Sequence, residues 1–284
     1  MKKLLKNEEI KENQINIPKE AGVIIPLLGN EKSPEMLMEI GAAINTRQKI
    51  QVINITEVPD QTLLEAISNK DSKIDSIKRQ VEVLSKEDNL NIEYESLVTY
   101  NIANTIQSLS HKTHSEWLVF GWNGRAYNGF LFSNPLGWIV SNVNSNFALF
   151  KDNGVRYITK VLLAIRVNSV DLKKLIETTD QLCQFYNASF TLFHVVSKEL
   201  SDPEIQEIRK KGNELLKDIR SEAEVKIIQS NNAIERVSNI SGEYDLLVLG
   251  TPRKETIISV LFGTGKDKFA ITSNCSVLRL TIKS

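Results

Sequence analysis

The chain has 284 residues, with 35 Lys and Arg against 35 Asp and Glu, so its formal net charge at pH 7 is zero. That balance argues against a protein that grips nucleic acid through its phosphates, and 41% hydrophobic with 25% charged residues is typical of a globular chain. The length favours two domains, each large enough to bury a core.

The first half of the sequence alternates short apolar runs with amphipathic segments. Apolar runs buried on both faces indicate strands, and apolar residues at helical spacing indicate helices. Strands are predicted at residues 23–25, 51–56, 91–98, 117–120 and 146–150, and helices at residues 34–44, 68–89 and 102–110.

The second half repeats this order. Strands are predicted at residues 160–165, 190–196, 225–228, 245–249 and 276–280, and helices at residues 172–182, 203–219 and 233–240. Strands that alternate with helices favour an α/β fold with a mostly parallel sheet covered by helices on both faces.

An internal alignment supports two similar domains. Residues 128–150 align with 258–280 without a gap, which places Phe132 on Phe262 and Asn144 on Asn274. The sequence therefore predicts an N-terminal tether at residues 1–20, a first domain at 21–150 and a second at 151–284. Each is expected to be an open parallel-sheet α/β/α sandwich of Rossmann-like type.

The order of elements, with a glycine-containing loop after Phe120 and again after Leu249, resembles the universal stress protein fold. The resemblance covers about residues 20–150 and 156–284, and it implies a tandem pair whose final strands, residues 146–150 and 276–280, pack together. Members that bind ATP carry Gly-x-x-Gly, nine residues, then Gly-Ser or Gly-Thr. They also carry an aspartate at the end of the first strand.

The first domain keeps only part of this motif. Gly121 and Gly124 form the opening pair, but Asn134 and Pro135 stand where Gly followed by Ser or Thr is expected. Proline has no backbone N–H to donate to a phosphate. The loop of Gly121, Gly124 and Asn134 is therefore interpreted as degenerate.

The second domain keeps a different part. Gly250 is present, Arg253 replaces the second glycine, and Gly263 and Thr264 stand at the expected distance. The first-strand acid is absent from both domains, with Arg166 at its place in the second. Gly250, Arg253, Gly263 and Thr264 are thus the candidate residues for ATP or AMP. The alternative, which we favour, is that they are turn residues kept for chain geometry.

A second resemblance is narrower. The segment AGVIIPLLGN at residues 21–30, EVPDQT at 57–62, Gly121-Trp122 and the linker at 151–152 are similar to the cytosolic C-terminal regions of some prokaryotic transporters. These are cation–chloride cotransporters and amino acid permeases of the amino acid–polyamine–organocation superfamily. The resemblance implies a non-enzymatic regulatory and dimerisation domain. Its partners would be its own membrane domain, which conducts Na, K and Cl, and a second copy of the chain.

The alternative function is a free-standing tandem universal stress protein that binds ATP or AMP. No catalytic residue and no metal site are predicted: His111 and His114 share a helical face without a third ligand nearby, and His194 is interpreted as a core histidine. A cluster of aromatic residues between positions 121 and 138 is either a docking surface or a local lid.

The expected location is the cytoplasm, at the cytosolic face of the cell membrane for a transporter domain. No apolar stretch approaches the roughly 20 residues of a spanning helix. The first twenty residues lack the apolar core of a secretory signal, and two cysteines in apolar settings fit a reducing compartment.

Overall fold

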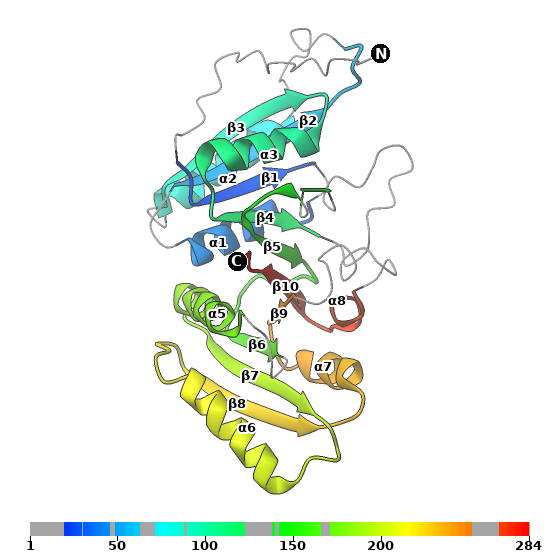
Figure 1. Ribbon diagram of the computed structural model, residues 1–284. Helices are drawn as coiled ribbons and strands as arrows, with labels where there is room; N and C mark the ends of the chain where they lie inside the picture. The colour runs from blue at the N-terminus through cyan, green and yellow to red at the C-terminus, as the bar shows by residue number, and fades with distance from the viewer. Residues whose placement is uncertain are drawn as a thin grey trace, which may run out of the picture.

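The computed structural model describes residues 20–29, 31–45, 49–62, 72–87, 90–122, 138–139, 142–165, 171–251 and 267–283. Ten strands form one continuous sheet in the order β3-β2-β1-β4-β5-β10-β9-β6-β7-β8 (Figure 1). Every neighbouring pair is parallel except β5 and β10. The predicted α/β fold is confirmed, with both strand sets joined in a single sheet.

The elements of the first half follow the predicted order. They are β1 (Val23–Leu27), α1 (Pro34–Ile44), β2 (Ile50–Glu57), α2 (Ser72–Glu87), β3 (Ile92–Thr99), α3 (Ile102–Thr113), β4 (Trp117–Gly121) and β5 (Asn146–Lys151). Pro34 occupies the first turn of α1. Backbone N–H groups in the first turn have no intrahelical acceptor, so the missing N–H of proline breaks no helix hydrogen bond there. The side chain of Asn101 caps α3 by accepting from the N–H of Asn104.

The second half has the same strand order as the first, read outward from the centre of the sheet. Its elements are β6 (Lys160–Ile165), α5 (Leu172–Tyr186), β7 (Ser189–Val196), α6 (Asp202–Leu215), β8 (Ala223–Gln229), α7 (Ala233–Ser241), β9 (Leu246–Gly250), α8 (Lys268–Thr272) and β10 (Ser276–Thr281).

In the second half one predicted helix end is wrong, and one short helix was not predicted. The helix predicted to reach Ile219 ends at Leu215, because the chain turns at Leu216, yet Leu216 and Ile219 still pack against the core. The short helix α8 was not predicted. Its five residues are too few to show a helical period, and it begins where Asp267 accepts from the N–H of Ala270.

The two halves meet along a seam at the centre of the sheet. The register of β5 on β10 places Ala148 opposite Leu280 and Phe150 opposite Leu278, which confirms the predicted contact between the final strands. Beside the seam α1 packs against α5, and Tyr186 donates to Glu39 Oε2 at 3.2 Å.

Two apolar clusters, one on each face of the sheet, form the core. One lies against α1, α2 and α5, and the other against α3 and α7. Both clusters contain residues of both halves, so the core is continuous across the seam. The domain boundary at residues 150 and 151 stays a prediction. Within the described residues no helix is both long and apolar enough to cross a bilayer.

Candidate functional site

The predicted glycine loops begin at equivalent places, the carboxyl ends of β4 and β9. In open parallel sheets this edge is where ligands bind. Gly121 and Gly250 are the last residues of these strands. The other candidate residues, Gly124, Asn134, Arg166, Arg253, Gly263 and Thr264, lie outside the described residues.

Both described glycines face a helix, but only Gly250 is crowded by it. A Cβ at Gly250 would lie 2.8 Å from Leu175 Cδ2, and a Cβ at Gly121 would lie 3.6 Å from Leu37 Cδ1. Leu37 and Leu175 are each the fourth residue of their helix, α1 and α5. In both halves a glycine thus ends a strand beside the fourth residue of a helix, and only at Gly250 would an added Cβ force the helix side chain to move.

We expect Gly250→Ala to lower the free energy of unfolding by about 1–3 kcal/mol, because the new methyl group overlaps the buried Leu175 side chain. Gly121→Ala is the matched control. Its nearest neighbour would be Glu31 Cγ at 3.3 Å, so a smaller loss is expected. Urea unfolding of both variants measures the difference, and equal losses would contradict the packing explanation.

The loop after β1 contains an acidic residue that the sequence reading missed. The backbone N–H groups of Leu28 and Gly29 donate to the two carboxylate oxygens of Glu31, at 2.6 and 2.9 Å. Gly29 has a φ of +87°, which favours glycine, and this turn folds the carboxylate back over the loop. Because Glu31 already accepts from these two donors, they are not free to hold a phosphate or a ribose.

A buried ion pair lies at the corresponding end of the second half. Arg279 of β10 donates to the carbonyl oxygen of Gly250 at 3.0 Å, and its guanidinium pairs with the carboxylate of Asp267. Both residues are 3% exposed. The positive charge of Arg279 at the end of β9 is thus balanced by an acid of the same chain, and this weakens its attraction for an anionic ligand.

The EVPDQT segment has a structural role in the first half. Glu57 Oε1 accepts from the N–H of Ile102, the first residue of α3, at 3.1 Å. The turn that follows is closed by a hydrogen bond from the N–H of Thr62 to the carbonyl of Pro59 (2.9 Å), and Tyr100 donates to the carbonyl of Thr62. A carboxylate at a helix N-terminus is favoured by the helix dipole. The segment therefore ties the end of β2 to the start of α3.

The rejected metal and thiol sites lie apart from these loops. The rings of His111 and His114 are 6.3 Å apart at the C-terminal end of α3, and in the part of the chain that the structure describes no three possible ligands gather. Cys183 and Cys275 are buried, and burial raises the pKa of both thiols. Neither cysteine is therefore an activated nucleophile.

The described part of the aromatic cluster is divided between core and surface. Trp122 is 6% exposed and its backbone N–H donates to the carbonyl of Phe150 at 2.8 Å, whereas Trp138 is 40% exposed. Tyr127, Phe130 and Phe132 lie outside the described residues.

His194 lies near the end of β7 with 6% of its surface exposed, and burial lowers its pKa. The unfolded chain, with an ordinary pKa of about 6.5, then binds the proton more readily than the folded chain. The free energy of unfolding is therefore expected to decrease as the pH falls below 6.5 toward the lower pKa of the folded chain, by at most about 1.4 kcal/mol per pH unit. Urea unfolding of the unmodified chain and of His194→Leu at pH 7.5 and pH 5 tests this. The decrease in unfolding free energy between the two pH values should be smaller in His194→Leu, and an equal decrease in both proteins would contradict the role of His194.

Comparisons with known proteins agree with this architecture. No family model matches the sequence. The chain is 20% identical over 253 residues to the Na(+)/H(+) antiporter NhaS5 of Synechocystis sp., an alignment that covers 87% of this chain and 36% of the antiporter. The chain thus spans about a third of the length of that relative.

Solved structures are similar over nearly the whole chain. A universal stress protein from Archaeoglobus fulgidus has a TM-score of 0.60 and 15% identity, covering 95% of this chain and 99% of that one. The cytoplasmic domain of a prokaryotic cation chloride cotransporter has a TM-score of 0.59 and 10% identity, covering 93% and 96%. The chain therefore has a universal stress protein-like fold, and its structural neighbours include a transporter cytoplasmic domain.

Proposed function

We propose that the chain is the cytosolic regulatory domain of a secondary cation transporter, without catalytic activity of its own. The observation that carries this proposal is the extent of the two transporter similarities. Both halves match the cytoplasmic domain of the cation chloride cotransporter, and most of the chain matches a part of the Na(+)/H(+) antiporter. The membrane domain of the same transporter is its proposed partner, and cation–chloride symport is the proposed activity of that part.

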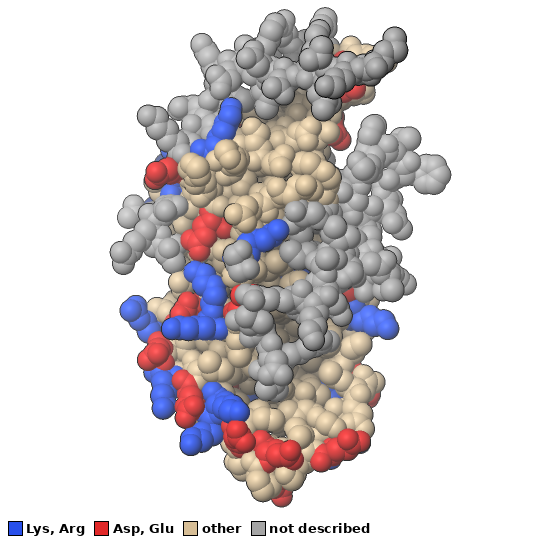
Figure 2. All heavy atoms as spheres, in the orientation of Figure 1, with Lys and Arg blue, Asp and Glu red and all other residues tan. Residues whose placement is uncertain are grey.

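The described residues beside the candidate nucleotide loops favour this proposal over nucleotide binding. The described donors after β1 are held by Glu31, and the arginine beside Gly250 is paired with Asp267. On the face seen in Figure 2, charged side chains of both signs are interspersed over the second half, which fits a chain without a nucleic-acid partner. Such a module acts through protein contacts at the cytosolic face of the membrane.

A homodimer through a second surface is part of the proposal. The final strands β5 and β10 already pair within one chain, so they have no free edge for another copy. The outer strands β3 and β8 carry charged residues such as Glu93, Glu95 and Lys226, which discourage edge-to-edge pairing. Dimerisation is therefore expected through helix faces. Light scattering on the isolated chain should give twice the monomer mass, and a monomer at high concentration would contradict this role.

Titration calorimetry with ATP and AMP separates the proposal from a free-standing nucleotide-binding protein. We expect no heat of binding for either nucleotide at micromolar to millimolar concentrations. Micromolar binding that is lost in Thr264→Arg, and kept in the control Thr272→Arg on α8, would overturn the proposal in favour of the nucleotide-binding alternative.

A further inference from the structure

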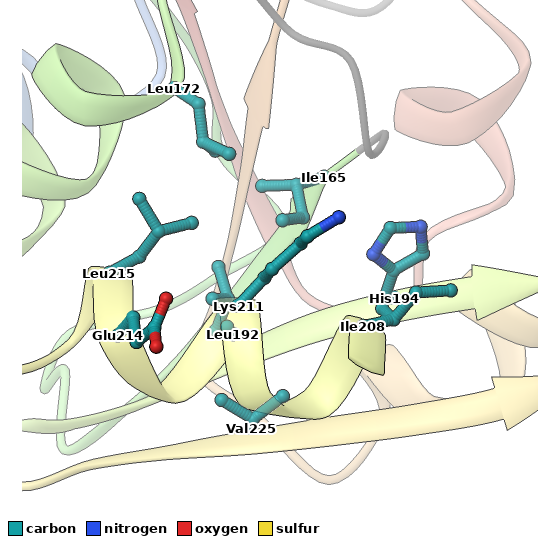
Figure 3. A pocket seen from close by; sticks show the side chains of 10 residues that line it. Ile165, Leu172, Leu192, His194, Ile208, Lys211, Glu214, Leu215 and Val225 are labelled. Atoms are coloured by element: carbon teal, nitrogen blue, oxygen red, sulfur yellow. The ribbon is translucent and has the colours of Figure 1, made fainter. Parts of the chain in front are cut away.

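An open groove of about 390 Å³ lies between α5 and α6 on the second half of the sheet (Figure 3). Strand β7 forms its floor with Leu192 and His194, and its walls carry Leu172, Ile208 and Leu215. Its volume is within the range of small-ligand sites, and its lining is largely apolar, as such sites are. The groove is on a helix-covered face of the sheet, whereas the glycine loops follow the strand ends.

The sheet register helps to explain why the groove is in the second half. Tyr94 of β3 pairs with Val52, and Val225 of β8 pairs with Leu192, so Tyr94 and Val225 hold equivalent positions in the two halves. Tyr94 packs against the core, whereas the smaller Val225 leaves space beside it. Gly212 of α6 rests directly on Val225, since a Cβ there would lie 3.0 Å from both Val225 methyl groups.

Two polar groups lie at one end of this apolar groove. His194 is only 6% exposed, and its ring faces the groove. No described residue hydrogen-bonds to this ring. Lys211 of α6 extends across the groove toward the end where His194 lies (Figure 3). Its Nζ pairs at 2.7 Å with Glu207, and both side chains are 64% exposed, so a ligand can compete with this surface pair. The acidic Glu214 lies at the opposite end.

We propose that this groove binds a small monocarboxylate with a hydrocarbon body. The carboxylate lies between the Lys211 ammonium and the His194 ring, and the hydrocarbon part covers Leu172, Leu192 and Ile208. Lys211 supplies the charge that an anion needs, and the imidazole, to which no described residue hydrogen-bonds, gains a hydrogen bond on binding. The site is separate from the transporter proposal, because it uses only residues of the second half and requires no membrane domain.

Titration calorimetry of the full chain with octanoate tests the proposal, with acetate and 1-octanol as matched probes. Octanoate is expected to bind at least about a hundredfold more tightly than acetate, because acetate lacks the apolar chain. It is expected to bind about fivefold more tightly than octanol, which lacks the charge. Octanol binding as tightly as octanoate, or no octanoate binding, would overturn the proposal.

Two variants and one control variant identify the groove as the site. Lys211→Gln is expected to weaken octanoate binding about fivefold and to leave octanol binding unchanged. Lys210→Gln, one residue away on the same exposed helix and outside the groove, should bind as the unmodified chain does. Ile208→Trp, which fills the groove from the helix side, should abolish binding of both probes. Octanoate affinity that is equal in all three variants would contradict the assignment.

Discussion

Replacing Asp267 with alanine is expected to lower the free energy of unfolding by about 3–5 kcal/mol. The substitution leaves the guanidinium of Arg279, which is 3% exposed, without its anionic partner inside the protein. It also removes the oxygen that accepts from the N–H of Ala270 at the start of α8. A buried charge that loses its partner costs more than the pair contributes, because the charge keeps its full desolvation penalty.

Urea unfolding followed by circular dichroism measures this effect. The matched control is the double variant Asp267→Leu with Arg279→Met, in which both charges are replaced by apolar groups. It is expected to recover most of the lost stability, since apolar replacement of a whole buried pair is often neutral. A single-variant loss below about 1 kcal/mol, or a double variant less stable than the single one, would contradict the role of the pair.

The position of this ion pair explains why its effect should be large. Arg279 lies in β10, between β9 on one side and the seam strand β5 on the other, where it pairs with Leu149. The same guanidinium donates to the carbonyl of Gly250 at the end of β9. One side chain thus connects the seam, the end of β9 and α8, and removing its partner affects all three.

Most of the fold could be predicted from local patterns. Runs such as Trp117–Phe120 within β4 are buried on both faces, so their sequences are continuously apolar and stand out from the amphipathic helices. The predicted contact between the final strands is also confirmed. It follows from the resemblance to paired stress-protein domains and is realised by the register of Phe150 on Leu278.

The features that the sequence did not predict depend on contacts between distant residues. Asp267 and Arg279 are twelve positions apart, and only the fold brings them together. Glu31 lies beyond the end of β1, and it folds back on the loop through a turn in which Gly29 adopts a positive φ. A glycine followed two residues later by an acid after a buried strand is the one local signal that could have suggested this capping.

The groove between α5 and α6 could not be predicted for a similar reason. Val225 lines it at the position that Tyr94 holds in the first half, and the equivalence of these two residues is known only from the strand register. His194 was interpreted as a core histidine, and its burial agrees, but its orientation toward a groove is a property of the packed helices. Sequence periodicity places a residue on a face and does not reveal whether a neighbouring helix fills the space beside it.

The second large effect is expected from Phe147→Ala at the seam, with a loss of about 3–5 kcal/mol. Phe147 is fully buried in β5, between Leu118 of β4 and Thr281 of β10, and its ring stacks on Phe120 with centroids 6.4 Å apart. Removing the ring leaves a cavity where the cores of the two halves meet. Because that core is continuous, we expect both halves to lose stability together.

The distribution of tryptophan allows a direct measurement. All three tryptophans lie between residues 117 and 138, so their fluorescence reports on the first half, while circular dichroism reports on both. In Phe147→Ala both signals should shift to lower urea by the same amount. Phe190→Ala, a control in β7 with 1% exposure and no part in the seam, should also shift the tryptophan signal if the halves unfold as one unit. A tryptophan midpoint that stays constant in Phe190→Ala would show instead that the seam does not couple the halves.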